Sequence, residues 1–368
     1  MTRVIRGAAH AYRLLDVGYS ISLDGALGVL ASSAPARVRP VRSEAAALQI
    51  PNPPVSVLLG GERVAIGGRS YDAEVLARVF DFGVASLCVR IPAGEDVAWD
   101  DFAAFGNAVD DATAIPALLE HHAQLLVERI APAIERPNIA PVREEYVVFR
   151  MRMVRGDDGG TLTSESLPRT VDLAPLLLNE RRVLATRARD DLLQHRYSYY
   201  TDDLAVLTWD NALVLDPVEG ASDVEYILEF ANAQLLELRY YDAVLDGELP
   251  KLYGRIEAAR GASMRHFSRR FSNLLGDMQR LYAESTELVE RAENALKVTD
   301  DVFLARVYSA ALEIFRGREW RAGVDRKLTL VRETYEMLNA EAQATRAEVL
   351  EWAIVILIVG EIIMAMVR

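Results

Sequence analysis

The most regular hydrophobic pattern in the chain lies near its C-terminus, between Val324 and Met366. Small or apolar residues recur there at alternating steps of four and three, which is the spacing of a helix with one continuous packing seam. The seam positions are Val324, Leu328, Val331, Tyr335, Leu338, Ala342, Thr345, Val349, Trp352, Ile356, Val359, Ile363 and Met366. The pattern predicts one long packed helix, and residues 353–368 at its end are almost wholly apolar.

The first half of the chain has a different pattern, in which short apolar runs are separated by turn residues. Residues 55–68 predict two short strands around the turn glycines Gly60 and Gly61, and residues 73–91 predict a second hairpin. A long strand is expected over 144–154. Because strands, helices and hairpins follow one another without a regular strand–helix–strand alternation, the pattern indicates an α+β fold.

After Pro217 the strand signals stop and long amphipathic helical patterns take over. Several such helices joined by short turns predict an antiparallel bundle. At 368 residues the chain exceeds the usual size of a single core. The predicted organisation is therefore an α+β domain over 1–216, a long-helix bundle or coiled-coil domain over 217–352, and an apolar tail over 353–368.

The apolar tail has two interpretations. Its uninterrupted part of about fifteen residues would span roughly 22 Å at ~1.5 Å per residue, which is short of the ~30 Å hydrocarbon core of a bilayer. Glu361 lies inside it, and a carboxylate in lipid needs a proton or a partner. Trp352 and Arg368 suit the two interfaces of a membrane anchor. The alternative is a core helix of a soluble oligomer.

The same segment carries a resemblance to a known family. Leu350, Glu351 and Trp352 precede an Ile/Val/Leu run that contains Glu361, and this order resembles the C-terminal signature of the required-for-meiotic-nuclear-division family. Residues 80–91 and 228–242 are similar to other parts of that family. The resemblance implies a C-terminal membrane anchor, assembly into large homo-oligomers and, from the mitochondrial members, support of translation by tethering ribosomes.

Composition narrows the classes of partner. The net charge of −13 argues against direct, sequence-specific nucleic-acid binding, because the chain as a whole repels phosphates. The single cysteine, Cys88, excludes an internal disulfide and a cysteine-based zinc site. The N-terminus lacks a long apolar signal segment, so membrane contact is expected from the C-terminus alone.

Motifs for chemistry are missing from the sequence. The five histidines have no HxH or HExxH spacing, and no serine lies in a GxSxG elbow. The densest polar group comprises Asp202, Asp203, Glu229, Asn232 and Arg239. It predicts either a polar contact network between a hairpin and the first bundle helix, or the site of a metal-dependent hydrolase or nuclease that uses Asp202, Asp203 and Glu229.

The sequence thus predicts a protein without catalytic, cofactor-binding or metal-ligating residues. The expected function is a non-enzymatic scaffold or tether, anchored in the bacterial inner membrane with its bulk in the cytoplasm, that self-associates through the seam. The alternatives are a cytoplasmic soluble homo-oligomer that buries its tail, and the metal-dependent enzyme. The residues expected to anchor or oligomerise are Leu350, Glu351, Trp352, Ile356, Val359, Glu361 and Ile363.

Overall fold

The chain folds into two compact units. The computed structural model describes residues 1–33, 35–37, 48–49, 52–180, 182–260, 264–294, 297–298 and 302–367. The first unit comprises Met1–Tyr240 and Arg291–Arg318, and the second comprises Tyr241–Glu290 and Glu319–Arg368. The first contains a mixed sheet with helices and the second is helical. The predicted α+β class with a C-terminal helical region is therefore confirmed.

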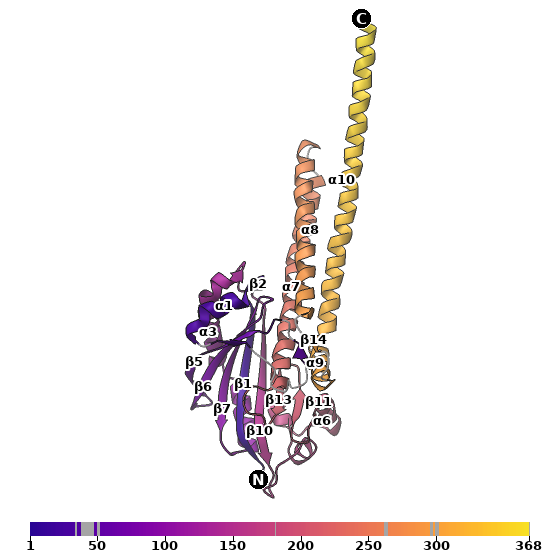
Figure 1. Cartoon of the computed structure of the whole chain (residues 1–368). Helices are drawn as coiled ribbons and strands as arrows, with labels where there is room; N and C mark the ends of the chain where they lie inside the picture. Colours follow the sequence, from indigo (N-terminus) through magenta and orange to yellow (C-terminus); the bar gives the residue numbers. More distant parts are fainter. Residues whose placement is uncertain are drawn as a thin grey trace. The chain divides into compact units, whose positions relative to one another are not determined.

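A ten-stranded sheet forms the frame of the first unit (Figure 1). Its order is β11-β12-β13-β10-β1-β7-β6-β5-β3, and β8 also pairs with β1. Neighbours run antiparallel except β10 and β13, which are parallel. The strands are β1 (Arg3–Asp16), β3 (Ala36–Arg37), β5 (Val55–Ile66), β6 (Arg69–Val79), β7 (Val84–Gly94), β8 (Val97–Ala98), β10 (Arg143–Arg155), β11 (Arg196–Tyr197), β12 (Leu204–Leu207) and β13 (Asn211–Leu215).

Two further strand pairs lie outside this sheet. One joins β2 (Ser20–Ile21) to β9 (Ile134–Glu135), and the other joins β4 (Leu48–Gln49) to β14 (Lys297–Val298). The second pair connects segments about 250 positions apart, a contact for which the sequence carries no local signal.

Glycines with positive φ lie in the turns of the hairpins. The turn between β6 and β7 contains Gly83 with φ +99°, and a Cβ there would lie 2.0 Å from the carbonyl oxygen of Gly18. Only glycine fits this position. The expected pair of short strands around Gly60 and Gly61 is wrong, because β5 continues to Ile66 through a register shift next to Gly60. The turn lies instead at Gly67 and Gly68, which both have positive φ.

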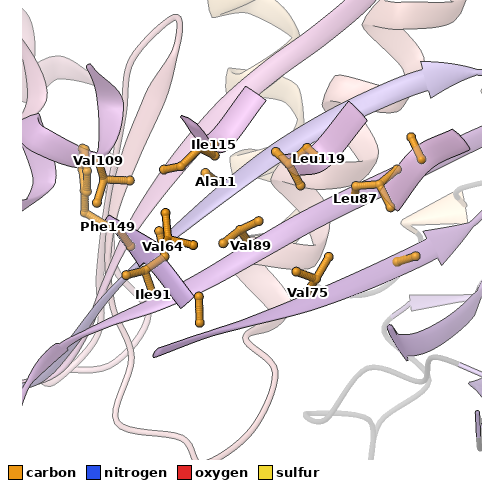
Figure 2. Packing of buried hydrophobic residues seen from close by; sticks show 14 of the residues in the cluster. Ala11, Val64, Val75, Leu87, Val89, Ile91, Val109, Ile115, Leu119 and Phe149 are labelled. Carbon is orange, nitrogen blue, oxygen red and sulfur yellow. The ribbon is translucent and has the colours of Figure 1, made fainter. Parts of the chain in front are cut away.

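One face of the sheet is covered by α1 (Leu23–Leu30), α2 (Trp99–Asp110) and α3 (Ala114–Ile130). Because side chains alternate along a strand, every second residue of β1 and β7 points to this layer. Figure 2 shows the resulting packing of apolar side chains from the strands with those of the helices. Its labelled members are Ala11, Val64, Val75, Leu87, Val89, Ile91, Val109, Ile115, Leu119 and Phe149.

The rest of the first unit is built from short helices, one further helix and the first part of a long one. Phe230 on the long helix, α7, lies 5.9 Å from Phe80 and 6.0 Å from Phe82, measured between ring centroids. Helix α9 packs against the same helix through Tyr308 and Phe230. These elements are α4 (Leu167–Thr170), α5 (Ala174–Leu177), α6 (Thr186–Leu192), α7 (Asp223–Arg260) and α9 (Val302–Ile314), with 3-10 helices at Ala31–Ser33, Ala131–Ala133 and Leu193–His195.

The second unit contains the end of α7, then α8 (Met264–Asn294) and most of α10 (Gly317–Val367). Lys327 on α10 pairs with Asp242 and Asp246 on α7, each at 2.6 Å. Arg255 on α7 pairs with Asp277 on α8 at 2.6 Å. The apolar side chains buried here are Leu245, Leu252, Ile256, Leu274, Met278, Val324, Leu328, Val331 and Leu338.

Helix α10 is much longer than its partners in this unit. At ~1.5 Å per residue, the α7 segment from residue 241 to 260 spans roughly 30 Å, whereas α10 from residue 319 to 367 spans roughly 73 Å. The end of α10 therefore continues beyond the helices that bury its first part, as Figure 1 shows.

Candidate functional site

The second face of the sheet is polar although it is buried. Side chains on this face alternate with those of the apolar core, so β1 contributes His10, Tyr12 and Asp16, and β10 contributes Arg150. All four are at most 8 % exposed. The first part of α7 covers them and presents glutamates at helical spacing. Buried ionisable groups must be paired or neutral, so each contact on this face matters.

The first glutamate of α7, Glu225, is surrounded by donors from the sheet. The His10 imidazole Nδ1 and the Tyr12 hydroxyl both hydrogen-bond its carboxylate, and Arg150 Nη1 lies 3.8 Å from Oε2. Burial acts to raise the pKa of Glu225, but His10, Arg90 and Arg150 outweigh it and hold that pKa well below its ordinary value. Glu225 is therefore a carboxylate at neutral pH.

The next glutamate, one helical turn further on, forms an ion pair with β6. Arg78 contacts the Glu229 carboxylate and also lies 4.9 Å from the ring centroid of Tyr226. Burial raises the pKa of Glu229, and Arg78 opposes that rise. A cavity of about 20 Å³ borders this pair and is also lined by Arg90. A cavity of that size accommodates about one water molecule.

The third glutamate faces another acid. Glu237 on α7 and Asp16 at the end of β1 are 1 % and 3 % exposed, and the two carboxyl groups interact electrostatically. Both carboxyl oxygens of Glu237 are buried without a hydrogen-bond partner among the described residues. Two buried carboxylates this close repel each other, which favours a proton on one of the two. Burial raises the pKa of Asp16 to about 7, and burial together with the charge of Asp16 raises that of Glu237 well above its usual range. Tyr240 lies within electrostatic reach of both carboxyl groups.

Of the residues on α7 that the sequence predicted as a polar group, two pair with strands of the sheet and one bonds within the helix. Arg239 forms an ion pair with Glu144 of β10, as Glu229 does with β6. Asn232 donates from Nδ2 to the carbonyl oxygen of Leu228 at 2.9 Å, a bond within the helix. These residues therefore contact different strands or their own backbone.

The two aspartates of the predicted group have local roles. Asp203 Oδ1 accepts hydrogen bonds from the backbone amides of Tyr199 at 2.7 Å and Tyr200 at 2.9 Å, which closes a turn. Asp202 is exposed. Within the described part of the chain, no three His, Cys, Asp or Glu side chains are grouped as a metal ion needs. The metal-dependent hydrolase or nuclease stays a prediction that these contacts do not support.

The strand side of this network was missed from the sequence. Arg78, Arg90 and Arg150 each stand in an apolar strand, where an alternating polar residue normally indicates solvent. The available signal was on the helix, because residues 224–237 are apolar on nearly all sides yet contain three glutamates. A helix buried all round must provide partners for its acids, and arginines on neighbouring strands are the natural choice.

The C-terminal seam is divided into two parts. Val324, Leu328, Val331 and Leu338 are buried within the second unit. The side chains of seam positions 342, 345 and 349 lie outside the described residues, and from residue 350 onward the large apolar side chains are exposed. Those of the segment 350–366 are Leu350, Trp352, Ile354, Val355, Ile356, Leu357, Ile358, Val359, Ile362, Ile363, Met364 and Met366, each between 48 % and 84 % exposed, and Glu351 and Glu361 are exposed among them.

A membrane anchor was expected at this segment, and that expectation is wrong. Over the described stretches of the chain, no helix combines the length and the apolar character needed to cross a bilayer. The predictions of a transmembrane helix and of an inner-membrane location are wrong for the same reason. Length explains the outcome, since the apolar run was short for a bilayer from the start and contains Glu361.

The fold and the site define a class: an α+β protein in which a long helix closes a buried, charged sheet face and a second helical unit follows. Residues 6–222 match the family model described as the N-terminal domain of uncharacterized protein MJ0711, so the chain belongs to that family. The uncharacterized protein MJ0711 of Methanocaldococcus jannaschii is 28 % identical over 196 residues, which cover 53 % of this chain and 59 % of that protein. No solved structure matches the chain.

This membership corrects the family expected from the tail. The resemblance to the required-for-meiotic-nuclear-division family is wrong, because the matching family model covers the first unit up to residue 222 instead. A short apolar run that follows Leu350, Glu351 and Trp352 is common to many packed or exposed helices and does not identify a family. The expected tethering of ribosomes had no other basis than that resemblance.

Proposed function

We propose that this protein is a non-enzymatic scaffold that assembles with copies of itself through the apolar segment 350–366. The segment would be buried in the core of a homo-oligomer formed by the same segment of other copies.

The observation that carries this proposal is the exposure of twelve large apolar side chains on one helix end. Monomeric proteins rarely expose a contiguous apolar patch above a few hundred Å², and a larger patch marks an interaction site. Transfer of one such side chain from water contributes about 1.5–3 kcal/mol. Burial of twelve such side chains would strongly favour association.

The length of α10 favours other copies as the occupant. Helix α10 extends beyond α7 and α8, and the large apolar side chains of 350–366 are exposed, so the described residues of the second unit do not cover this segment. Residues 354–359 are six consecutive apolar positions and therefore surround the helix on every side. A helix that is apolar all round needs partners on more than one side, which favours a bundle of at least three copies over a two-stranded coil.

The test is the oligomeric state of the full chain, measured by sedimentation without detergent at micromolar concentration. Wild type should sediment as one defined oligomer. Replacing Ile356 and Val359 together by glutamate (I356E/V359E) places two carboxylates in the predicted contact. The loss of about 1.5–3 kcal/mol per side chain should raise the dissociation constant at least about 100-fold.

The matched control is L330E/M337E, which adds the same two charges to α10 at side chains that are 45 % and 51 % exposed and lie outside the segment. It should keep the wild-type oligomer. A monomeric wild type, an aggregate without a defined size, or equal dissociation of both variants would contradict the proposal. Flotation of the wild type with phospholipid vesicles in place of self-association would contradict it as well.

A further inference from the structure

The first unit contains a second feature that the assembly does not use. A pocket of about 320 Å³ lies at the β11 edge of the sheet, and three arginines line it: Arg169, Arg196 and Arg306. We infer that this pocket binds the phosphate group of a small phosphorylated molecule.

The three arginines come from segments far apart in the chain. Arg169 is on α4, Arg196 is on β11 and Arg306 is on α9. All three elements belong to the first unit. Pairing of Arg196 with Val206 and of Tyr197 with Ala205 fixes β11 to the sheet, so the edge that carries Arg196 is held in place. The tertiary fold therefore brings three arginines from separate elements to the wall of one pocket.

The charge of the pocket is unusual for this chain. No ion pair joins any of the three arginines to a carboxylate in the part of the chain that the structure describes, although Asp and Glu outnumber Lys and Arg by 54 to 41. Arg189 on α6 shows the ordinary outcome, since it pairs with Asp172 at 2.6 Å. Glu165 is the acid on the pocket wall. Three positive charges against one negative charge leave a local excess of about two, which matches a phosphate dianion.

The other walls set the size and class of the ligand. Phe303 and Leu204 are 6 % and 3 % exposed and form an apolar floor, and Tyr197 adds an aromatic ring. Arg306 lies close enough to Tyr197 to act against the rise in the pKa of that phenol, which burial causes. A volume of about 320 Å³ is at the lower end of ligand pockets, which run from about 300 to 1,000 Å³. Arginine recognises phosphate through two parallel hydrogen bonds, so a metabolite-sized phosphate monoester fits this chemistry.

The experiment is calorimetric titration of the full chain with inorganic phosphate and, separately, with adenosine monophosphate, at constant ionic strength. Millimolar or tighter binding of at least one of them is expected. A charge-assisted hydrogen bond contributes about 1.5–3 kcal/mol, so Arg306→Gln and Arg196→Gln should each weaken binding about 10-fold or more. Both side chains are exposed, so the variants should keep the wild-type melting temperature.

Arg187→Gln is the matched control, because Arg187 is an exposed arginine on α6 of the same unit that does not line the pocket. It should change the affinity less than about twofold, as expected for screened charge at a distance. The inference is overturned if neither probe binds at millimolar concentration. It is also overturned if Arg187→Gln weakens binding as much as Arg306→Gln, because the arginines would then act only through the general field.

Discussion

At the scale of single residues, the three glutamates of α7 show how position decides charge. Glu225 faces donors and cations from β1 and β10 and is held as a carboxylate. Glu229 faces Arg78. Glu237 lies eight residues further along the same helix, about two turns, and faces Asp16, so that pair keeps a proton. The same type of side chain is thus a paired anion at the start of α7 and a neutral acid three turns later.

The acid pair predicts a pH dependence of stability. The folded state raises the pKa of Asp16 to about 7 and that of Glu237 well above its usual range, whereas unfolded Asp and Glu titrate near 3.9 and 4.3. Above about pH 4 the folded state therefore binds more protons than the unfolded state, and the free energy of unfolding falls as pH rises through 7. Glu237→Gln removes one acid and lets an amide donate to Asp16. The variant's free energy of unfolding should therefore fall by at least about 2 kcal/mol less than that of the wild type between pH 4 and pH 8.

The measurement is urea unfolding across that pH range, with Glu128→Gln as the control. Glu128 is an exposed glutamate on α3, so its replacement should leave the slope of stability against pH unchanged. An unchanged slope for Glu237→Gln would show that the two carboxyl groups do not share a proton.

From the sequence, only the helix residues of this network could be predicted, and the strand residues that pair with them could not. Glu229, Asn232 and Arg239 stand out because polar residues interrupt an apolar helix. Arg78 lies 151 positions from Glu229, and the strand pattern that contains it is indistinguishable from one with a solvated face. Which acids and bases meet across a sheet depends on the order of the strands, and that order is set by contacts remote in sequence.

At the scale of elements, α10 serves two purposes along one seam. The heptad spacing from Val324 to Met366 was predictable, because side-chain periodicity is a local property. The spacing does not show which helices pack against the seam. The first part is occupied by α7 and α8 of the same unit, and the end at 350–366 remains exposed. Element lengths decide this division, and those become known only when the helix boundaries are known.

The division predicts a sharp contrast between neighbouring residues. Leu338 is fully buried in the second unit and Met337 beside it is 51 % exposed. Leu338→Ala should therefore cost about 2–5 kcal/mol of unfolding free energy through lost burial and a cavity. Met337→Ala should change stability by no more than about 0.5 kcal/mol. Urea unfolding followed by far-ultraviolet circular dichroism measures both, and an equal effect of the two changes would contradict the assignment of Leu338 to the core of that unit.

At the scale of the whole molecule, assembly and folding should be linked. The chain passes between the two units at residues 240–241, 290–291 and 318–319, so neither unit is a simple continuous segment. The proposed contact at 350–366 adds stability that depends on protein concentration, since partners bind the folded second unit and not the unfolded chain. The family match ends at residue 222 and so carries no information on this part.

That linkage gives the last prediction. The melting temperature of the full chain should rise with protein concentration, because association at about 100 times the dissociation constant adds about 2.7 kcal/mol to apparent stability. In I356E/V359E the melting temperature should be independent of concentration and equal to the wild-type value at high dilution, since both replaced side chains are exposed in the single chain. Scanning calorimetry over a hundredfold range of about micromolar concentrations tests this. A lower melting temperature of the variant at every dilution would mean that the segment stabilises its own chain, and the proposed assembly would then lose its basis.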